Sequence, residues 1–209
     1  MNRPVADLNE ASKTKDRIML EAAILFSRRG YASVSVRDIA EQVNIKASSI
    51  YNHFESKEAL FEAILDNIRD IYLGYYARLE KQIEKTTSFE QVLDSLFAEL
   101  KEVYQIFIYY GVSLITTEQF RNEKANDIFN DVLIRIGVDY SKSKFDECIE
   151  KKWVKEFDTQ ALATLFMNSV LVGTLMRTHQ DMGQQIAYEP AEMFSSIQRY
   201  ILRSLEVLV

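Results

Sequence analysis

The sequence predicts an all-α protein. Its 209 residues include only two prolines and six glycines, which leaves little material for the tight turns of a β-sheet. Apolar residues recur three and four positions apart through most of the chain, the spacing that places them on one face of a helix. Serines that can cap a helix precede several of these apolar runs. We therefore expect helices that pack through apolar faces.

Three short helices are expected near the amino end, over residues 13–29, about 36–42 and about 46–54. Gly30 ends the first, because glycine readily takes the left-handed conformation that closes a last turn. Ser35 and Asp38 form a capping box that opens the second. Asn44 follows it, and Asn is the other residue that tolerates this conformation in a sharp turn. The second and third helices therefore form a helix-turn-helix, whose second helix can enter a DNA major groove roughly 12 Å wide.

Longer helices are expected in the rest of the chain, over about 56–82, 88–110, 117–136, 142–153, 159–182 and from residue 190 onward. Ser56 caps the first of them, which leaves the three short helices without a flexible linker. Gly111 and the segment GVDYSKS, residues 137–143, are expected breaks. Pro190 suits the first turn of the last helix, where its missing N–H costs nothing.

Charge divides the chain unequally. Residues 1–60 carry nine Lys/Arg and eight Asp/Glu, a net charge of +1, whereas the remainder carries −7. Only the amino-terminal part is therefore not repelled by phosphate. We expect an N-terminal arm over residues 1–12, a DNA-binding domain over 13–58 and a helical ligand-binding and dimerisation domain over 59–209.

Several classes of protein are disfavoured. The amino end lacks an export signal, and the longest apolar run, about residues 106–115, is shorter than the roughly 20 residues that span a bilayer, so we expect a cytoplasmic protein. Cys148 is the single cysteine, and a packing role is favoured over a redox sensor. Two distant histidines provide no metal-ligand spacing. No glycine-rich phosphate loop or catalytic motif is found, so neither an enzyme nor a cofactor is expected.

The segments AAILFSRRGYASVSVRDIAEQVNI and SSIYNHFESKEALF resemble the TetR family of bacterial transcriptional regulators. The match is collinear over about 50 residues, and the rest of the chain is similar to the family only in its helical pattern. The resemblance implies a repressor that binds a palindromic operator as a homodimer and leaves it when a small lipophilic ligand binds. Asn44 and Ser48 stand where the family usually has Gly. The substitution at Ser48 bears on which DNA sequence is preferred.

The resemblance places the DNA contacts at Ser35, Arg37, Lys46, Ala47, Ser48, Ser49, Tyr51, Asn52, His53 and Lys57. Arg37 suits a bidentate contact with guanine, although a phosphate contact or a pair with a nearby acid is equally favoured. Ala47 suits a thymine methyl group and Asn52 an adenine edge. For the two serines, helix capping is the alternative role. Tyr51, His53 and Lys57 are similar to the phosphate contacts of the family.

The helical domain contains many aromatic residues, most of which are expected in its core. Because members of the family commonly enclose an apolar pocket, we also select candidate ligand-binding residues: Tyr104, Phe107, Tyr110, Asn168 and Thr174. The excess of acidic residues would suit a lipophilic cation, but acids on the solvated surface would explain it as well.

The last two expected helices are apolar on more than one side and cannot remain in contact with water. We expect them to pair with a second copy in a four-helix interface, in which Ser169 and Gly173 allow close approach. An alternative function is a helical DNA-binding or nucleoid-associated protein with no small-molecule ligand. A metabolite that releases the DNA would distinguish the two.

Overall fold

The computed structural model describes residues 14–102, 106–181, 183–186 and 189–205, of which 98–102, 106–109 and 181 are described as helical backbone only. The helices are α1 (Thr14–Arg29), η1 (Tyr31–Ser33), α2 (Val36–Val43), α3 (Ala47–Tyr51), α4 (Lys57–Ile83), α5 (Phe89–Glu102), α6 (Ile106–Glu118), α7 (Glu123–Asp127), the π-helix η2 (Ile128–Ile136), α8 (Gly137–Glu150), α9 (Thr159–Asp181) and α10 (Pro190–Ser204). No β-strand occurs within these ranges, so the expected all-α fold is confirmed.

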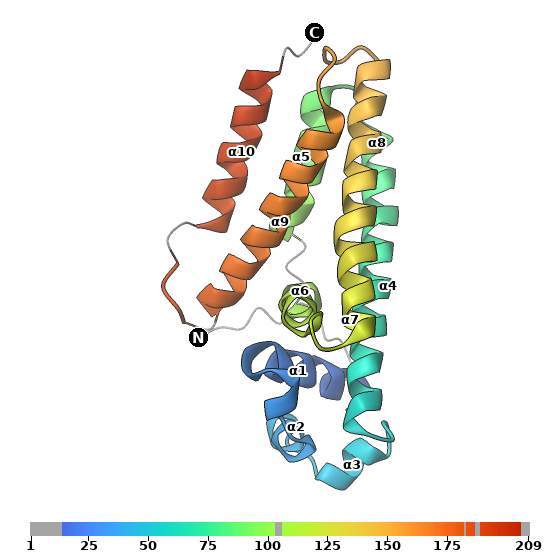
Figure 1. Cartoon of the computed structure of the whole chain (residues 1–209), viewed down its shortest axis with the longest axis vertical. Helices are drawn as coiled ribbons and strands as arrows, with labels where there is room; N and C mark the ends of the chain where they lie inside the picture. The colour runs from blue at the N-terminus through green and yellow to red at the C-terminus, as the bar shows by residue number, and fades with distance from the viewer. Residues whose placement is uncertain (1–13, 103–105, 182, 187–188, 206–209) are drawn as a thin grey trace.

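The chain forms a small head, α1 to α3, below a larger helical body, and α4 runs from one into the other (Figure 1). Helix α4 has 27 residues and is therefore about 40 Å long. Its first turn is capped by Ser56, whose Oγ accepts a hydrogen bond from the Ala59 N–H at 3.0 Å. This continuous helix joins head and body without a flexible linker, as the sequence predicts.

Local signals define the head. The Ser35 Oγ accepts a hydrogen bond from the Asp38 N–H at 3.2 Å, and the Ser35 N–H donates to the Asp38 carboxylate at 2.7 Å, which completes the expected capping box. Asn44 has φ 59° and thus adopts the left-handed conformation expected of it. Helix α3 has only five residues, shorter than the predicted range of 46–54. The outcome is a helix-turn-helix whose first helix is capped at both ends.

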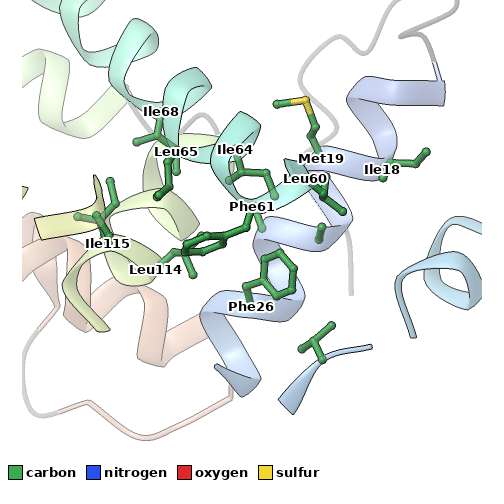
Figure 2. Close-up of a cluster of buried hydrophobic side chains, with 14 of the residues drawn as sticks. Ile18, Met19, Phe26, Leu60, Phe61, Ile64, Leu65, Ile68, Leu114 and Ile115 are labelled. Carbon is green, nitrogen blue, oxygen red and sulfur yellow. The ribbon is translucent and has the colours of Figure 1, made fainter. Parts of the chain in front are cut away.

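The core of the head continues into the body. Phe26 of α1 is fully buried, and its ring lies 5.3 Å from that of Tyr31 and 5.8 Å from that of Phe61 on α4. Side chains of α1, α4 and α6 converge in this cluster, including Leu114 and Ile115 of α6 (Figure 2). Because α6 contributes side chains to the same cluster as α1, head and body share one apolar cluster.

A second apolar cluster fills the rest of the body. It joins α4, α5, α8, α9 and α10, and rings dominate it: Phe97 lies 5.2 Å from Phe166 and 6.3 Å from Phe194. Cys148 is buried in this cluster, and burial raises the pKa of its thiol to about 11. A raised pKa disfavours the reactive thiolate, which supports the packing role.

Several predicted helix boundaries in the body are wrong. The predicted helix 117–136 spans the end of α6 at Glu118 and the start of α7 at Glu123. In two further cases a glycine is the reason. Gly111 lies inside α6, where a Cβ would be 2.9 Å from Cγ1 of Ile68, so this glycine permits close packing on α4. Gly137 begins α8 directly after η2, and a Cβ there would lie 2.8 Å from the Tyr76 hydroxyl. The segment predicted as a break is therefore helical. Glycines that admit a neighbouring helix resemble helix breakers in sequence.

Candidate functional site

The exposed side of the helix-turn-helix carries most of the residues that the sequence assigns to DNA. Ser35, Arg37, Lys46, Ser48, Tyr51, Asn52 and His53 are exposed, and Ala47, Ser49 and Lys57 are half-buried. The opposite side of α2 and α3 is apolar and buried through Ile39, Val43 and Ile50. Tyr51 retains 54% of its surface although it is large and aromatic. An exposed polar face on a short, braced helix is the arrangement that reads a major groove.

Arg37 and Ser35 lie at the amino end of α2. Arg37 is in the first turn, and its side chain is exposed. Ser35 also donates its hydroxyl proton to the Asp38 carboxylate at 2.6 Å. This hydrogen bond, with the one from the Ser35 backbone, holds the pKa of Asp38 below its usual value. The carboxylate therefore remains ionised and keeps this turn closed.

Lys57 is the first residue of α4, and in this structure it lies on an aromatic ring. Its ammonium is 4.1 Å from the ring centroid of Tyr31 and 5.9 Å from that of Phe26, which are cation–π distances. The Tyr31 hydroxyl donates a hydrogen bond to the neighbouring Glu58 at 3.0 Å. Tyr31 therefore holds both side chains of the first turn of α4.

Two contacts between head and body were not predicted from the sequence. Arg28 of α1 donates to the Tyr110 hydroxyl at 2.8 Å, and the Tyr31 N–H donates to the Glu118 carboxylate at 3.0 Å. The partners are 82 and 87 positions apart in the chain. No local pattern in a single sequence identifies such pairs, because only the fold brings them together.

A cavity lies in the body between α4, α6, η2 and α9. Its lining residues are Tyr72, Tyr76, Val112, Leu133, Ile134, Met167, Val170, Leu171 and Thr174. None of them is charged, and burial raises the pKa values of Tyr72 and Tyr76, so both phenols stay protonated. The volume is about 20 Å³, the room for about one water molecule.

Of the three selected ligand contacts whose side chains the structure describes, only Thr174 lines this cavity. Asn168 is exposed on α9, and Tyr110 is buried against Arg28. Phe107 lies in α6, but its side chain is outside the described part of the chain, as is the whole of Tyr104. The uncharged lining gives no support to a lipophilic cation and favours surface acids as the explanation of the net charge.

Helices α9 and α10 expose apolar side chains. Leu165 and Val172 on α9 retain 64% and 48% of their surface, and Tyr200 on α10 retains 71%. Residues 159–180 are long and apolar enough to cross a membrane by composition alone. Only 28% of the most apolar window is buried within the chain, so most of its residues remain at least partly exposed. Gly173 does not serve this outer face, because a Cβ there would lie 2.3 Å from the Phe194 ring of the same chain.

Metal binding has little support. Among the residues described, no group of three or more His, Cys, Asp and Glu side chains could hold a metal ion. His53 and His179 are both exposed, the first in the head and the second near the end of α9.

Comparisons with known proteins place the chain in a family. Residues 18–64 match the model of the bacterial regulatory proteins of the tetR family. The biofilm operon icaADBC HTH-type negative transcriptional regulator IcaR of Staphylococcus aureus is 31% identical over 159 residues, which cover 74% of this chain and 81% of IcaR. The chain belongs to the TetR family. It is a DNA-binding transcriptional regulator and not an enzyme.

Solved structures support the same fold. A transcriptional regulator from Saccharomonospora viridis in complex with choline superposes with a TM-score of 0.71 at 20% identity, covering 94% of this chain and 100% of the other. The TetR family protein CprB from S. coelicolor A3(2) gives 0.67 at 21% identity, covering 93% and 90%. At these identities the likeness extends to the fold of this TetR family member and not to its ligand.

Proposed function

We propose that this TetR family regulator is a cytoplasmic homodimeric repressor that binds a palindromic operator and is released from it by a small, lipophilic ligand. The observation that carries the proposal is the exposed polar face of α2 and α3, set above a buried apolar face. IcaR is named a negative regulator, and a repressor named KstR2 from Mycolicibacterium smegmatis is 33% identical over 100 residues. These names support repression.

In the proposed complex, α3 enters the major groove. Ala47, Ser48, Ser49 and Asn52 face base edges, and Arg37 reaches a guanine from the first turn of α2. Ser35, Lys46, Tyr51, His53 and Lys57 contact phosphates on either side. The net charge of +1 in residues 1–60, against −7 in the remainder, supports an approach to DNA through the head.

The proposed dimer forms through α9 and α10. Leu165, Val172 and Tyr200 are more exposed than large apolar side chains usually are, and they lie on these two helices. A second copy would remove them from water and form the four-helix interface expected from the sequence. A symmetric pair presents two copies of α3, which matches the two halves of a palindrome.

The proposed ligand is uncharged and mostly apolar. The cavity between α4, α6, η2 and α9 has a lining that suits such a molecule, and the hydroxyl groups of Tyr72, Tyr76 and Thr174 are its polar groups. Entry requires the cavity to widen, since pockets for small molecules usually measure roughly 300–1,000 Å³. Tyr110 and Asn168, which do not line the cavity, would contact a ligand only in the widened form. Tyr104 and Phe107 remain candidates whose side chains lie outside the described part of the chain.

The small cavity also favours a second candidate function, a DNA-binding or nucleoid-associated protein with no small-molecule ligand. The test is to select bound genomic fragments with the purified protein, and then to measure operator binding by fluorescence anisotropy with and without uncharged lipophilic compounds. One or a few palindromic sites, and a compound that weakens binding at least tenfold, support the repressor. Binding throughout the genome that no compound alters supports the second candidate.

A further inference from the structure

The carboxyl half of α6 holds the head at a second point beyond the shared core. Glu118 is the last residue of α6, and although charged it retains only 6% of its surface. Its Oε1 accepts the Tyr31 N–H at 3.0 Å. Gly30, with φ 77°, precedes Tyr31 and has no side chain that could cap η1. Glu118 therefore supplies from the body the acceptor that the head lacks at this turn.

Tyr31 connects this carboxylate to the start of α4. Its hydroxyl donates to Glu58 at 3.0 Å, and its ring lies under the Lys57 ammonium at 4.1 Å. Burial, followed by the hydrogen bond to Glu58, raises the pKa of Tyr31 to about 12, so the phenol remains a donor at neutral pH. The ring also packs 4.6 Å from Phe61. A shift of the Tyr31 backbone would thus move the surface on which Lys57 rests.

Helix α6 also reaches the cavity. Val112 lines it, six residues before Glu118, a separation of about 9 Å along the helix. Packing against α4 is close at Gly111, where Ile68 occupies the space of a side chain. A change in the cavity that displaces α6 therefore displaces Glu118 as well, because a helix of this length moves as a rigid unit.

We propose that Glu118 is a positioning residue for DNA binding, which fixes Tyr31 and through it sets the position of Lys57. This inference rests on the proposed role of Lys57 as a phosphate contact. It adds a route by which α6 changes the affinity for DNA while the head remains folded: movement of α6 withdraws the carboxylate from the Tyr31 N–H, and the Lys57 ammonium loses its fixed position.

The test compares Glu118→Ala with Glu118→Gln in the full-length protein. Both changes remove the same negative charge, but only Gln retains an oxygen that can accept the Tyr31 N–H, so their difference isolates the acceptor. We expect the Ala variant to bind DNA about tenfold more weakly than the Gln variant. Gln119→Ala is the neighbouring control: the Gln119 side-chain amide donates to the Thr116 carbonyl in the last turn of α6, and this variant should bind as the wild type does.

A double-mutant cycle with Lys57→Ala distinguishes positioning from general support of the fold. If Glu118 acts through Lys57, the difference between the Ala and Gln variants falls to less than twofold when Lys57 is absent. A tenfold difference that persists without Lys57, or equal binding by the Ala and Gln variants, would overturn the proposal. Circular dichroism verifies that each variant folds. If the Ala variant does not fold, Glu118→Asp replaces it, because Asp keeps the charge but shortens the side chain. The Asp variant should bind DNA about threefold more weakly than the wild type.

Each titration is run on an operator fragment and on a duplex of unrelated sequence at low salt. A phosphate contact is independent of sequence, so the cycle with Lys57 can be read on either duplex. Failure of the repressor proposal would appear as equal wild-type affinity for both duplexes. Failure of the present inference would appear as a double-mutant cycle in which Glu118 and Lys57 show no coupling on either duplex.

Discussion

The head and the body expose opposite kinds of surface. The head exposes Arg37, Ser48 and Asn52 together with the ring of Tyr51, whereas α9 and α10 of the body leave Leu165, Val172 and Tyr200 in contact with water. A polar face on short helices suits DNA, and an apolar face on long helices suits another copy of the chain. The difference supports the proposal that the two surfaces serve different partners, although α4 contributes buried side chains to both apolar clusters.

The largest expected effects come from removing one ring from each core. Phe26→Ala in the cluster of the head and Phe97→Ala in that of the body should each lower the free energy of unfolding by about 3–5 kcal/mol. Both side chains are fully buried. Because the first cluster reaches into the body, Phe26→Ala should shift the denaturant midpoint equally by circular dichroism and by fluorescence of Trp153, the single tryptophan. An unchanged Trp153 midpoint would mean that the head unfolds alone.

A smaller loss of stability is expected at a glycine of the body. Gly173→Ala should cost about 1–3 kcal/mol of unfolding free energy, because the new Cβ meets the Phe194 ring at 2.3 Å. Gly74→Ala on α4 is the matched control, since its nearest neighbour is the flexible end of Arg78 at 3.5 Å. The control should be neutral or stabilising by up to about 1 kcal/mol. Chemical denaturation of both variants measures the difference. Equal losses of unfolding free energy would show that the close approach of Phe194 to Gly173 is not the cause.

On the head, a base contact and a phosphate contact should differ. Arg37→Ala should cost about 1–3 kcal/mol of operator binding and relax the preference at one base pair in each half-site. Tyr51→Phe should cost about 0.5–1.5 kcal/mol on every sequence, because it removes a single hydrogen bond to phosphate. Anisotropy titrations on operator and unrelated duplexes measure both. Equal losses on the two duplexes for Arg37→Ala would make Arg37 a phosphate contact.

The smallest effect concerns the exposed cap of α2. Hydrogen bonds from Ser35 lower the pKa of Asp38 in the folded protein, so the ionised carboxylate contributes stability above its usual pKa and loses that contribution as pH falls through the lowered value. Asp38→Asn should therefore lower Tm slightly at pH 7, and the gap from the wild type should narrow as the buffer is acidified toward pH 3. A gap that widens on acidification would contradict this account of the cap.

Most of the head could be predicted because its helices are set by neighbouring residues. The capping box at Ser35, the left-handed turn at Asn44 and the cap at Ser56 all operate within three or four positions. The face assigned to DNA followed from the same local geometry together with the family resemblance.

The body depends instead on residues that are distant in the chain. Gly111 and Gly137 read as breaks, because only the fold shows that Ile68 and Tyr76 occupy the spaces beside them. The contact of Glu118 with Tyr31 was not predicted for the same reason, since the two residues are distant in the chain. Tyr110 was selected as a ligand contact, but its hydroxyl accepts a hydrogen bond from Arg28. Apolar spacing identifies which residues are buried, but it does not identify their partners.

The central claim is that the exposed face of α2 and α3 binds DNA while α9 and α10 pair with a second copy. Sedimentation of the protein with a labelled palindromic operator tests it most directly, because one measurement depends on both surfaces. The account predicts two chains per operator, with half-site centres roughly 34–36 Å apart or slightly more and an affinity that falls steeply with salt. Leu165→Asp on the apolar face should yield monomers that no longer hold the full operator. One wild-type chain bound with full affinity, or a Leu165→Asp variant that still binds as a pair, would contradict the account.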